Sequence, residues 1–375
     1  MHKRPIIAVT VSNDLATDQR VLKVCRSLYD LGYMPRMIGR KLPESIDMPD
    51  VSFEHKRMKL LFTSGPAFYA ELNLRLFFLL LFSKLDFVHA NDLDTLLPAY
   101  LVSVLRRKPL VYDTHEYFTG VPEIQKRPLV KKIWKGIESF VFPKLKRVIT
   151  VNDSIASLYE NDYGILPKVI RNIPTSVRKE IIPLAKKDIP GVSEDDFVII
   201  LQGAGINVDR GAEEAVEMMK HLEGCKLIIA GSGDVIGSLK IRASQDDLNG
   251  RIIFLPKMKY SELMQITAAC NLGLTLDKDT NINYRYSLPN KIFDYIHAGI
   301  PVFASNLPEV RKVVEQYGVG FVAESHNPEV MAAQINSLKS NPQKLSNTRA
   351  ACRTATEELR WEKESVILEL FYPKV

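Results

Sequence analysis

The sequence predicts two α/β domains in series, each built on a parallel, doubly wound sheet. Three observations indicate this fold class. Short apolar strands alternate with amphipathic helices in both halves of the chain. The alternation stops at 171–193, a stretch that contains three prolines, and then restarts. The length of 375 residues suits two domains of roughly 150 to 200 residues each.

The first half begins with an apolar strand at 6–11. A helix is expected at Asp18–Leu31, because its apolar residues fall on one face and Gly32 follows as a C-cap. The other elements predicted in this half are a strand at 86–90, a helix at 95–105 and strands at 110–113 and 147–151.

The second half repeats the pattern after the linker. We expect strands at 197–201, 226–230, 252–255, 272–276 and 301–304. We expect helices at 211–222, 261–269 (with Ser261 as N-cap), 290–298 and 347–371.

Charge is spread unevenly along the chain. The net charge is +6, and residues 1–175 hold 26 Lys and Arg against 18 Asp and Glu, a balance of +8. This excess fits an ordinary solvated surface, or attraction to an anionic partner such as a membrane face or a phosphate-bearing acceptor. No recognised nucleic-acid module accompanies the charge, so no nucleic-acid partner is expected.

Two further features bear on the location of the protein. The four cysteines are scattered without a C-x-x-C pair, which argues against a zinc site or a disulfide framework, and the N-terminus lacks a secretory apolar region. We therefore expect a cytoplasmic protein. The apolar run Leu76–Phe82 is far too short to span a bilayer, so it predicts a buried or half-buried helix, with membrane contact as the alternative.

In parallel sheets ligands bind beyond the carboxyl ends of the strands. After the strand at 197–201 come Gly203 and Gly205, which would let a phosphate approach the backbone, and Arg210, which would add a cation. The alternative is a tight turn with a surface arginine. Gly231 and Gly233 follow the next strand without a dinucleotide-binding spacing, so they predict a plain loop.

The stretch 287–301 carries the strongest signal. Pro289 precedes a helix start, with Asn290 as a candidate N-cap and Lys291 beside it. Free N–H groups and a lysine there would suit a diphosphate. Asp294 lies on about the same helix face as Asn290, where its carboxylate could accept both hydroxyls of a ribose. An exposed Asp294 on an amphipathic helix is the alternative.

Polar residues also follow strands of the first half. His115 and Glu116 follow the strand at 110–113, Asp92 follows the strand at 86–90, and Asn13 and Asp14 follow the first strand. His115 could act as a base or as a hydrogen-bonding partner of a sugar.

Together these segments resemble the family-four-like retaining glycosyltransferases of the GT-B fold. The resemblance spans nearly the whole chain, and the stretch at 289–301 is its most specific part. It is carried by Asp18–Leu22, His89–Asp92, Tyr112–Glu116, Arg210-Gly211, Pro289–Tyr295 and Gly299–Pro301.

The resemblance implies two Rossmann-like domains facing a central cleft. An acceptor domain would occupy 1–175, a donor domain 176–350, and a C-terminal helix at 351–375 would cross back to the first domain. The donor would be a UDP- or GDP-linked sugar, with Arg210 and Lys291 on its diphosphate and Asp294 on its ribose. A hexosyl group would pass to a glycan or lipid-linked acceptor, with no metal and no cofactor.

The resemblance also assigns the residues of the first domain. His115 and Glu116 are the candidate catalytic residues, with His115 near the transferred sugar. The acceptor would enter near Asn13, Asp14 and Asp92, and the basic domain could touch a membrane.

The chain departs from the family pattern at three places. Tyr286 replaces the first of two glutamates, Ala204 and Gly205 stand where an arginine is common, and Ser12–Leu15 replaces a glycine-rich loop. These changes concern the sugar contacts more than the nucleotide contacts. They leave two alternatives open: a nucleotide-sugar-binding protein that has lost catalysis, or a nucleotide-sugar epimerase that uses His115 and Glu116.

Overall fold

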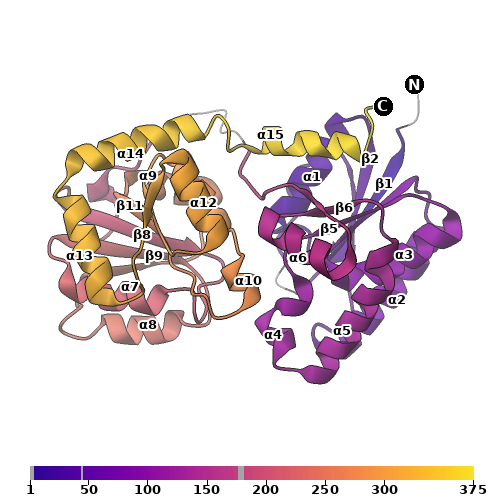
Figure 1. The fold of residues 1–375 in the computed structure, drawn as a ribbon, viewed down its shortest axis with the longest axis horizontal. Coiled ribbons are helices and arrows are strands. Elements are labelled where there is room, and N and C mark those ends of the chain that lie inside the picture. Colours follow the sequence, from indigo (N-terminus) through magenta and orange to yellow (C-terminus); the bar gives the residue numbers. More distant parts are fainter. Residues whose placement is uncertain (1–3, 44, 176–180) are drawn as a thin grey trace. The chain divides into compact units, whose positions relative to one another are not determined.

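The computed structural model describes residues 4–43, 45–175 and 181–375 (Figure 1). The chain forms two compact units, which we call the N-unit (Met1–Asn172 with Trp361–Val375) and the C-unit (Ile173–Arg360). The division follows Asn172, close to the boundary expected after 175; residues 176–180, where the second domain was expected to begin, lie outside the described residues. The chain re-enters the N-unit at Trp361, so 351–360 belong to the C-unit.

The N-unit contains a seven-stranded sheet in the order β3-β2-β1-β4-β5-β6-β7. Each neighbouring pair of strands is parallel. The strands are β1 (Ile6–Asp14), β2 (Met34–Arg40), β3 (Glu54–Met58), β4 (Phe87–Asn91), β5 (Leu110–Thr114), β6 (Val148–Thr150) and β7 (Lys168–Val169). The order reverses between β1 and β4, and such a switch point is where parallel sheets bind ligands.

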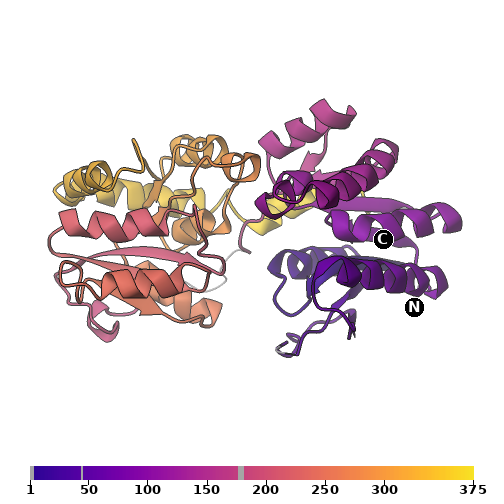
Figure 2. The same ribbon diagram turned by 90° about the horizontal axis from the view of Figure 1, so that it is seen from below.

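Helices lie on both sides of the N-unit strands (Figure 2). They are α1 (Gln19–Asp30), α2 (Gly65–Phe82), α3 (Leu93–Arg106), α4 (Pro122–Gln125), α5 (Pro128–Val141), α6 (Asp153–Tyr163) and α15 (Trp361–Glu364), with the 3-10 turns η1 (Phe118–Gly120), η2 (Phe142–Lys144) and η5 (Ser365–Leu370). The Asp18 side chain caps α1 by accepting from the Val21 N–H, so Asp18 is the N-cap and not the first helical residue expected from the sequence.

Helix α2 contains the apolar run at 76–82. Its Phe68, Leu72, Leu76 and Leu80 are buried, so the expected half-buried helix is confirmed. Within the described residues it is the single helix whose length and composition alone would allow it to cross a membrane, and 22% of it is buried.

The C-unit contains a six-stranded parallel sheet in the order β10-β9-β8-β11-β12-β13. Its strands are β8 (Phe197–Gly203), β9 (Cys225–Gly231), β10 (Ile252–Leu255), β11 (Leu272–Thr275), β12 (Val302–Ala304) and β13 (Gly320–Val322). Two buried clusters, one on each face of the sheet, form the core. The Rossmann-like fold of both units is confirmed.

The C-unit helices surround this sheet. They are α7 (Ala212–Met218), α8 (Ile236–Ala243), α9 (Tyr260–Ala269), α10 (Ile282–Arg285), α11 (Asn290–His297), α12 (Pro308–Tyr317), α13 (Pro328–Lys339) and α14 (Pro342–Ala355), with η3 (Lys186–Asp188) and η4 (Met219–His221). Helix α9 starts one residue before Ser261, and Lys259 occupies the N-cap, so that cap prediction is wrong.

The single helix expected at 347–371 is also wrong. Helix α14 ends at Ala355, and α15 and η5 then follow in the N-unit. The break holds Leu359, which is fully buried in the C-unit core and whose carbonyl contacts His297 Nε2 at 2.6 Å. The chain therefore packs Leu359 into the C-unit core before it returns to the N-unit at Trp361.

Candidate active site

In the C-unit, the loop after β8 packs backbone to backbone on the loop after β9. The Ile206 N–H donates to the Ser232 carbonyl at 2.9 Å, and the Ser232 N–H donates to the Gly203 carbonyl at 3.2 Å. A Cβ atom at Gly231 would lie 1.9 Å from the Gly203 oxygen, and one at Gly233 would lie 2.0 Å from the Ile206 oxygen. Gly231 and Gly233 therefore hold the β8 loop in place, a role that the plain-loop interpretation missed.

Gly203 and Gly205 have open surroundings. A Cβ at Gly203 would come no closer than 3.6 Å to the atoms around it, and one at Gly205 would meet only Asn207, at 3.9 Å. Both positions leave room beside the backbone, as a bound phosphate would require.

Arg210 is held from two sides. Its Nη1 lies 3.4 Å from Oδ1 of Asp277, and its guanidinium lies 4.4 Å from the centroid of the Tyr284 ring. Asp277 is almost fully buried just beyond β11, and its Oδ2 has no hydrogen-bond partner. Asp277 and Tyr284 thus orient the guanidinium, and this favours a positioned cation over a freely moving surface arginine.

Helix α11 begins with an uncapped N-terminus. Pro289 is the N-cap and makes no side-chain hydrogen bond, whereas Asn290 is the first helical residue, so the prediction of Asn290 as N-cap is wrong. The Ile292 N–H donates to the Pro289 carbonyl at 3.2 Å, so the N–H groups of Asn290 and Lys291 are the ones that an anion can meet. Lys291 follows directly; burial lowers the pKa of its ammonium group, and nearby Arg210 adds to that effect against the opposing charge of Asp277.

Asp294 is half-buried and already hydrogen-bonded. Gln202 Nε2 donates to its Oδ2 at 3.2 Å, and the Tyr260 hydroxyl donates to its Oδ1 at 2.7 Å. Two neutral donors therefore fix the orientation of a carboxylate that lies one helical turn after the start of α11. This arrangement differs from the exposed, solvated Asp294 of the alternative interpretation.

Tyr295 anchors this helix to the sheet. Its hydroxyl accepts from the Gln202 N–H at 3.2 Å and donates to the Leu274 carbonyl at 3.0 Å. Its ring lies directly on β11, where a Cβ at Gly273 would be 2.4 Å from a ring carbon. A glycine in the strand thus lets α11 approach closely, which sets the position of Asp294.

In the N-unit, His115 is held by Asp92. The His115 N–H donates to Asp92 Oδ1 at 2.9 Å, and His115 Nδ1 lies 3.0 Å from Asp92 Oδ2. Asp92 has φ +57° and ψ 165°, a backbone conformation that costs a non-glycine residue about 1–3 kcal/mol. The double contact with His115 maintains this conformation and brings Asp92, expected at the acceptor, against the candidate catalytic histidine.

The charge around His115 favours its protonated form. Burial favours neutral imidazole, but the Asp92 and Asp113 carboxylates outweigh burial and raise the pKa of His115 to about 9. Its Nε2 has no hydrogen-bond partner and lies 3.9 Å from Asp113 Oδ2. At neutral pH His115 is therefore a cationic donor, which favours the hydrogen-bonding role over the role of base.

A buried network lies behind His115. Arg20 donates two hydrogen bonds to the Asp113 carboxylate, from Nε at 3.1 Å and from Nη2 at 2.8 Å. It also donates to the Ile170 carbonyl. Burial acts to raise the pKa of Asp113, but the Arg20 guanidinium holds it well below its usual range. His89 Nδ1 contacts the Tyr372 hydroxyl at 2.9 Å, so the C-terminal segment joins this network.

The other N-unit candidates have mixed surroundings. Asp14 pairs with Arg57 at 2.8 Å, and exposed Asn13 donates to Asp18 at 3.4 Å. The Glu116 carbonyl accepts from the hydroxyl groups of Thr114 and Tyr159. The backbone of Glu116 is thus a structural element of the turn.

Asp94 is a carboxyl group that the sequence interpretation missed. It is buried, its Oδ2 accepts from the Ser12 hydroxyl, and its Oδ1 has no partner. Burial, followed by the charge of Asp92, raises the pKa of Asp94 to about 7. Within the described part of the chain, no three His, Cys, Asp or Glu side chains group as metal ligands would.

Two family models match the sequence, one over each half. The description "Glycosyltransferase Family 4" matches residues 18–180, and "Glycosyl transferases group 1" matches residues 185–358. Both units thus carry a glycosyltransferase signature. The donor candidates lie within the second range, and Asp92, His115 and Glu116 lie within the first, whereas Asn13 and Asp14 precede it. The chain is a family-four-like glycosyltransferase of the GT-B fold. No curated protein sequence matches it significantly.

Solved structures share the fold of this glycosyltransferase. HepE of Anabaena, in complex with UDP and glucose, is 14% identical with a TM-score of 0.75, over 99% of this chain and 100% of that chain. A sucrose-phosphate synthase of Thermosynechococcus elongatus is 15% identical with a TM-score of 0.76, over 98% of each chain. WaaG, involved in lipopolysaccharide biosynthesis, is 15% identical with a TM-score of 0.70, over 98% of this chain and 100% of that chain.

Several residues that orient the candidate groups within each unit were not among the predicted site residues. They are Ser12, Asp94, Gln202, Tyr260, Asp277 and Tyr284. Ser12, Asp94, Gln202 and Asp277 lie at or just beyond the carboxyl ends of strands, so the rule that located Asp92 could have found them. Tyr260 and Tyr284 carry no such sequence signal. Tyr286, where the family has its first glutamate, follows directly after α10.

Proposed function

We propose that this glycosyltransferase transfers a hexosyl group from a UDP- or GDP-linked sugar to a glycan or a lipid-linked acceptor. One observation carries the proposal. A positioned arginine (Arg210), a half-buried lysine (Lys291), an uncapped helix start and an oriented carboxylate (Asp294) all occur in the C-unit, on the loop after β8 and on α11. The solved complexes of HepE with UDP and with UDP-glucose add support from the same fold.

Each group has a chemical task. The first-turn N–H groups of α11, Lys291 and Arg210 bind the diphosphate and stabilise its charge as the glycosidic bond breaks. Asp294 accepts hydrogen bonds from the ribose hydroxyls in place of Gln202 and Tyr260. Gly203 and Gly205 leave space for the donor beside the β8 loop.

The N-unit supplies the cationic His115, which donates a hydrogen bond to the transferred sugar. The acceptor binds near Asn13, Asp14 and Asp92, and Glu116 completes the candidate catalytic pair. The likeness to the retaining family supports retention of the anomeric configuration. The proposed reaction uses neither metal nor cofactor, because these cations occupy the role that a metal would fill. The enzyme works in the cytoplasm, with a peripheral contact to a membrane.

Titration calorimetry with UDP, GDP and ADP and their sugar conjugates, with and without EDTA, tests the donor assignment. We expect tight binding of one diphosphate, UDP or GDP, with the same affinity in EDTA. Binding that disappears with EDTA would refute metal independence, and no binding of any nucleotide would refute the donor site. Proton NMR of the product then reads the anomeric configuration and separates transfer from epimerisation.

A further inference from the structure

Helix α2 leaves an apolar stripe uncovered. Leu74, Phe78 and Phe82 follow one another at four-residue spacing and therefore share one helix face. They are 59%, 50% and 81% exposed, and the rings of Phe78 and Phe82 are stacked. A helix that is apolar on all sides is ordinarily buried. In this protein the N-unit covers only the opposite face of α2.

The stripe continues across two neighbouring helices. Asn73 on α2 donates to the Asp94 carbonyl of α3 at 2.9 Å, and Arg106 of α3 donates to the Leu80 carbonyl at 3.0 Å. Tyr100 of α3 meets Phe140 of α5 edge to face. These contacts place α2, α3 and α5 side by side (Figure 1). The apolar face, as we call it, consists of Leu74, Phe78, Phe82, Leu101, Val104, Leu105 and Phe140, all of which are exposed.

The exposed charge around the apolar face is mainly basic, and Asp86, which follows α2, is paired with Lys108 at 3.1 Å. Of the acids on the three helices, Asp94 and Glu138 are buried and Glu71 is paired with Arg75 at 2.6 Å. Lys144 lies over the Phe140 ring, with its Nζ 3.4 Å from the ring centroid. Basic side chains on or beside the helices that are exposed are Arg75, Lys84, Arg107, Lys131, Lys132 and Lys144. Aromatic and aliphatic side chains with a basic surround complement a bilayer that carries anionic headgroups.

The fold also determines how α2 can meet a lipid bilayer. Leu72, Leu76 and Leu80 are fully buried against the N-unit, so α2 cannot leave the unit to span a bilayer. Its exposed stripe can only lie in the plane of the interface, where such side chains enter roughly 5–10 Å into the headgroup region.

We propose that the apolar face of α2, α3 and α5 docks this enzyme on an anionic lipid bilayer. The proposal deepens the membrane contact of the proposed function, and it rests on that function only for the purpose of the contact, which is delivery of a lipid-linked acceptor. The docking itself follows from the exposed side chains and their charge.

Vesicle co-sedimentation tests it with the full chain. The wild type should bind phosphatidylglycerol–phosphatidylcholine vesicles and bind pure phosphatidylcholine vesicles weakly. Phe78→Glu/Phe82→Glu should weaken binding to the anionic vesicles by about tenfold or more, because two exposed rings are lost from the interface. The control Ile241→Glu/Leu370→Glu changes two exposed apolar residues outside the face by the same charge and should bind like the wild type.

Lys131→Glu/Lys132→Glu tests the electrostatic part of the proposal. It should weaken binding to anionic vesicles and reduce the loss of binding on added salt.

The experiments distinguish failure of the membrane-docking proposal from failure of the proposed function. Circular dichroism and calorimetric nucleotide binding are measured on the same preparations. Retained fold and nucleotide affinity with no vesicle binding by the wild type, or equal vesicle binding by Phe78→Glu/Phe82→Glu, overturns the docking alone. A concentration-dependent dimer that this variant abolishes, without vesicle binding, overturns lipid in favour of a second copy. Vesicle binding without nucleotide binding overturns the proposed function alone.

Discussion

Asp294 illustrates how the structure prepares a carboxylate for a polar ligand. The side chain is oriented by Gln202 and Tyr260, neither of which carries a charge that would neutralise it. A ribose can therefore replace two neutral donors with its own hydroxyl groups at little cost. The arrangement lowers the entropy that must be lost when the nucleotide binds.

Replacement of this carboxylate should weaken nucleotide binding without unfolding the C-unit. In Asp294→Ala we expect the affinity for the preferred diphosphate to fall about ten- to hundredfold, because hydrogen bonds to a charged group contribute about 1.5–3 kcal/mol. Calorimetry measures the change. Asp246→Ala, an exposed acid after α8, is the control and should leave affinity unchanged. Equal affinity in both variants would exclude the ribose contact.

His115 should make the N-unit sensitive to alkaline pH. Its pKa rises from 6.5 to about 9 on folding, so the protonated form stabilises the fold fully below pH 6.5 and this stabilisation is lost as pH rises through about 9. His115→Gln lacks the charge, so it should cost up to about 3 kcal/mol at low pH and much less above pH 9. Urea unfolding across this range measures it. A difference that is constant with pH, or that also occurs in the exposed His55→Gln, would contradict the assignment.

At single positions, the sequence predicted the charged residues of the candidate site but not the side chains that orient these charged residues. Arg210, Lys291, Asp294, His115 and Asp92 are where strand ends and a helix start predict them. Their partners come from other parts of the chain: Asp277 and Tyr284 orient Arg210, and Tyr260 reaches Asp294 from α9. Such pairings depend on how helices pack on the sheet, which periodicity does not encode. Asn290 is not the N-cap, because Pro289 holds the extended conformation before the helix, with φ −62° and ψ 136°, and Asn290 is already helical.

At the scale of elements, α11 is positioned by the strand beneath it. Its hydroxyl-bearing Tyr295 contacts β8 and β11, and Gly273 provides the space for the ring. A strand glycine is usually weakening, but in β11 it permits the close approach of a functional helix.

A methyl group at that position should displace the helix. In Gly273→Ala we expect about 1–3 kcal/mol less stability in the C-unit, through overpacking against Tyr295, together with weaker nucleotide binding although no ligand contact is removed. Chemical denaturation and calorimetry measure the two effects. Gly237→Ala in α8 has nothing within 4 Å of the new Cβ, and it should be neutral or stabilising. Full nucleotide affinity in Gly273→Ala would show that α11 is not positioned by this contact.

Two edge strands that the sequence did not predict share a physical cause. Strand β3 (Glu54–Met58) is a largely polar edge strand, and β13 (Gly320–Val322) has three residues, so neither gives an apolar run. The continuous helix expected over 347–371 failed because Leu359 must enter the C-unit core before Trp361 enters the N-unit. Tertiary burial, not local propensity, ends α14.

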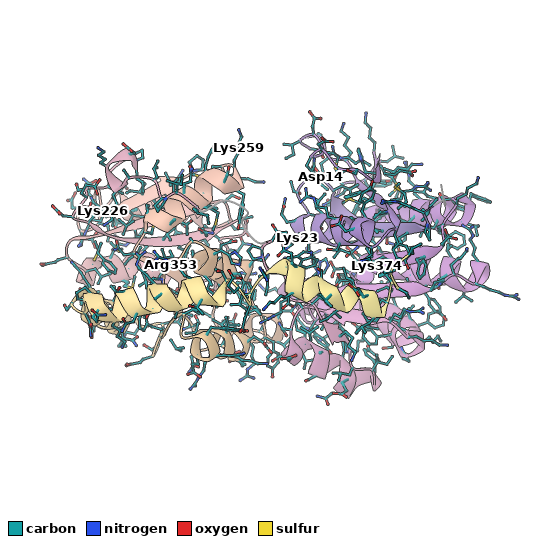
Figure 3. All side chains as sticks on the ribbon, turned by 90° about the horizontal axis from the view of Figure 1, so that it is seen from above. Asp14, Lys23, Lys226, Lys259, Arg353 and Lys374 are labelled. Atoms are coloured by element: carbon teal, nitrogen blue, oxygen red, sulfur yellow. The ribbon has the colours of Figure 1, made fainter. Side chains whose placement is uncertain are left out.

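For the whole molecule, the segment Trp361–Val375 completes the N-unit. Glu364 accepts from the Arg171 N–H at 2.8 Å and from its Nε and Nη2 at 3.1 and 2.6 Å. Trp361 donates to Ser27, and the Lys23 ammonium lies 4.9 Å from the centroid of the Trp361 ring. Lys23 is labelled in Figure 3. Each unit has its own core, so calorimetry should resolve two unfolding transitions.

Weakening the segment should therefore affect one transition. In Glu364→Gln the N-unit transition should fall by about 3–8 °C, since loss of a charged hydrogen-bonded pair costs about 1.5–2 kcal/mol and each kcal/mol shifts the midpoint of such a unit by about 2–4 °C. The C-unit transition should stay in place. Glu369→Gln, exposed on η5, is the control. Equal shifts of both transitions in differential scanning calorimetry would show that the segment does not act on the N-unit alone.

The return of the chain to the N-unit also affects the order in which the two units can complete folding during synthesis on the ribosome. Domains usually fold in order from the N-terminus as they emerge. Here the first unit lacks the Tyr372 partner of its buried His89 until Tyr372 is translated, well after the C-unit. At 5–20 residues per second the interval between Asn172 and Trp361 takes roughly 10–40 s. During that time the C-unit can finish folding first, while the nascent N-unit lacks Trp361, Leu368, Phe371 and Tyr372, which complete its apolar core.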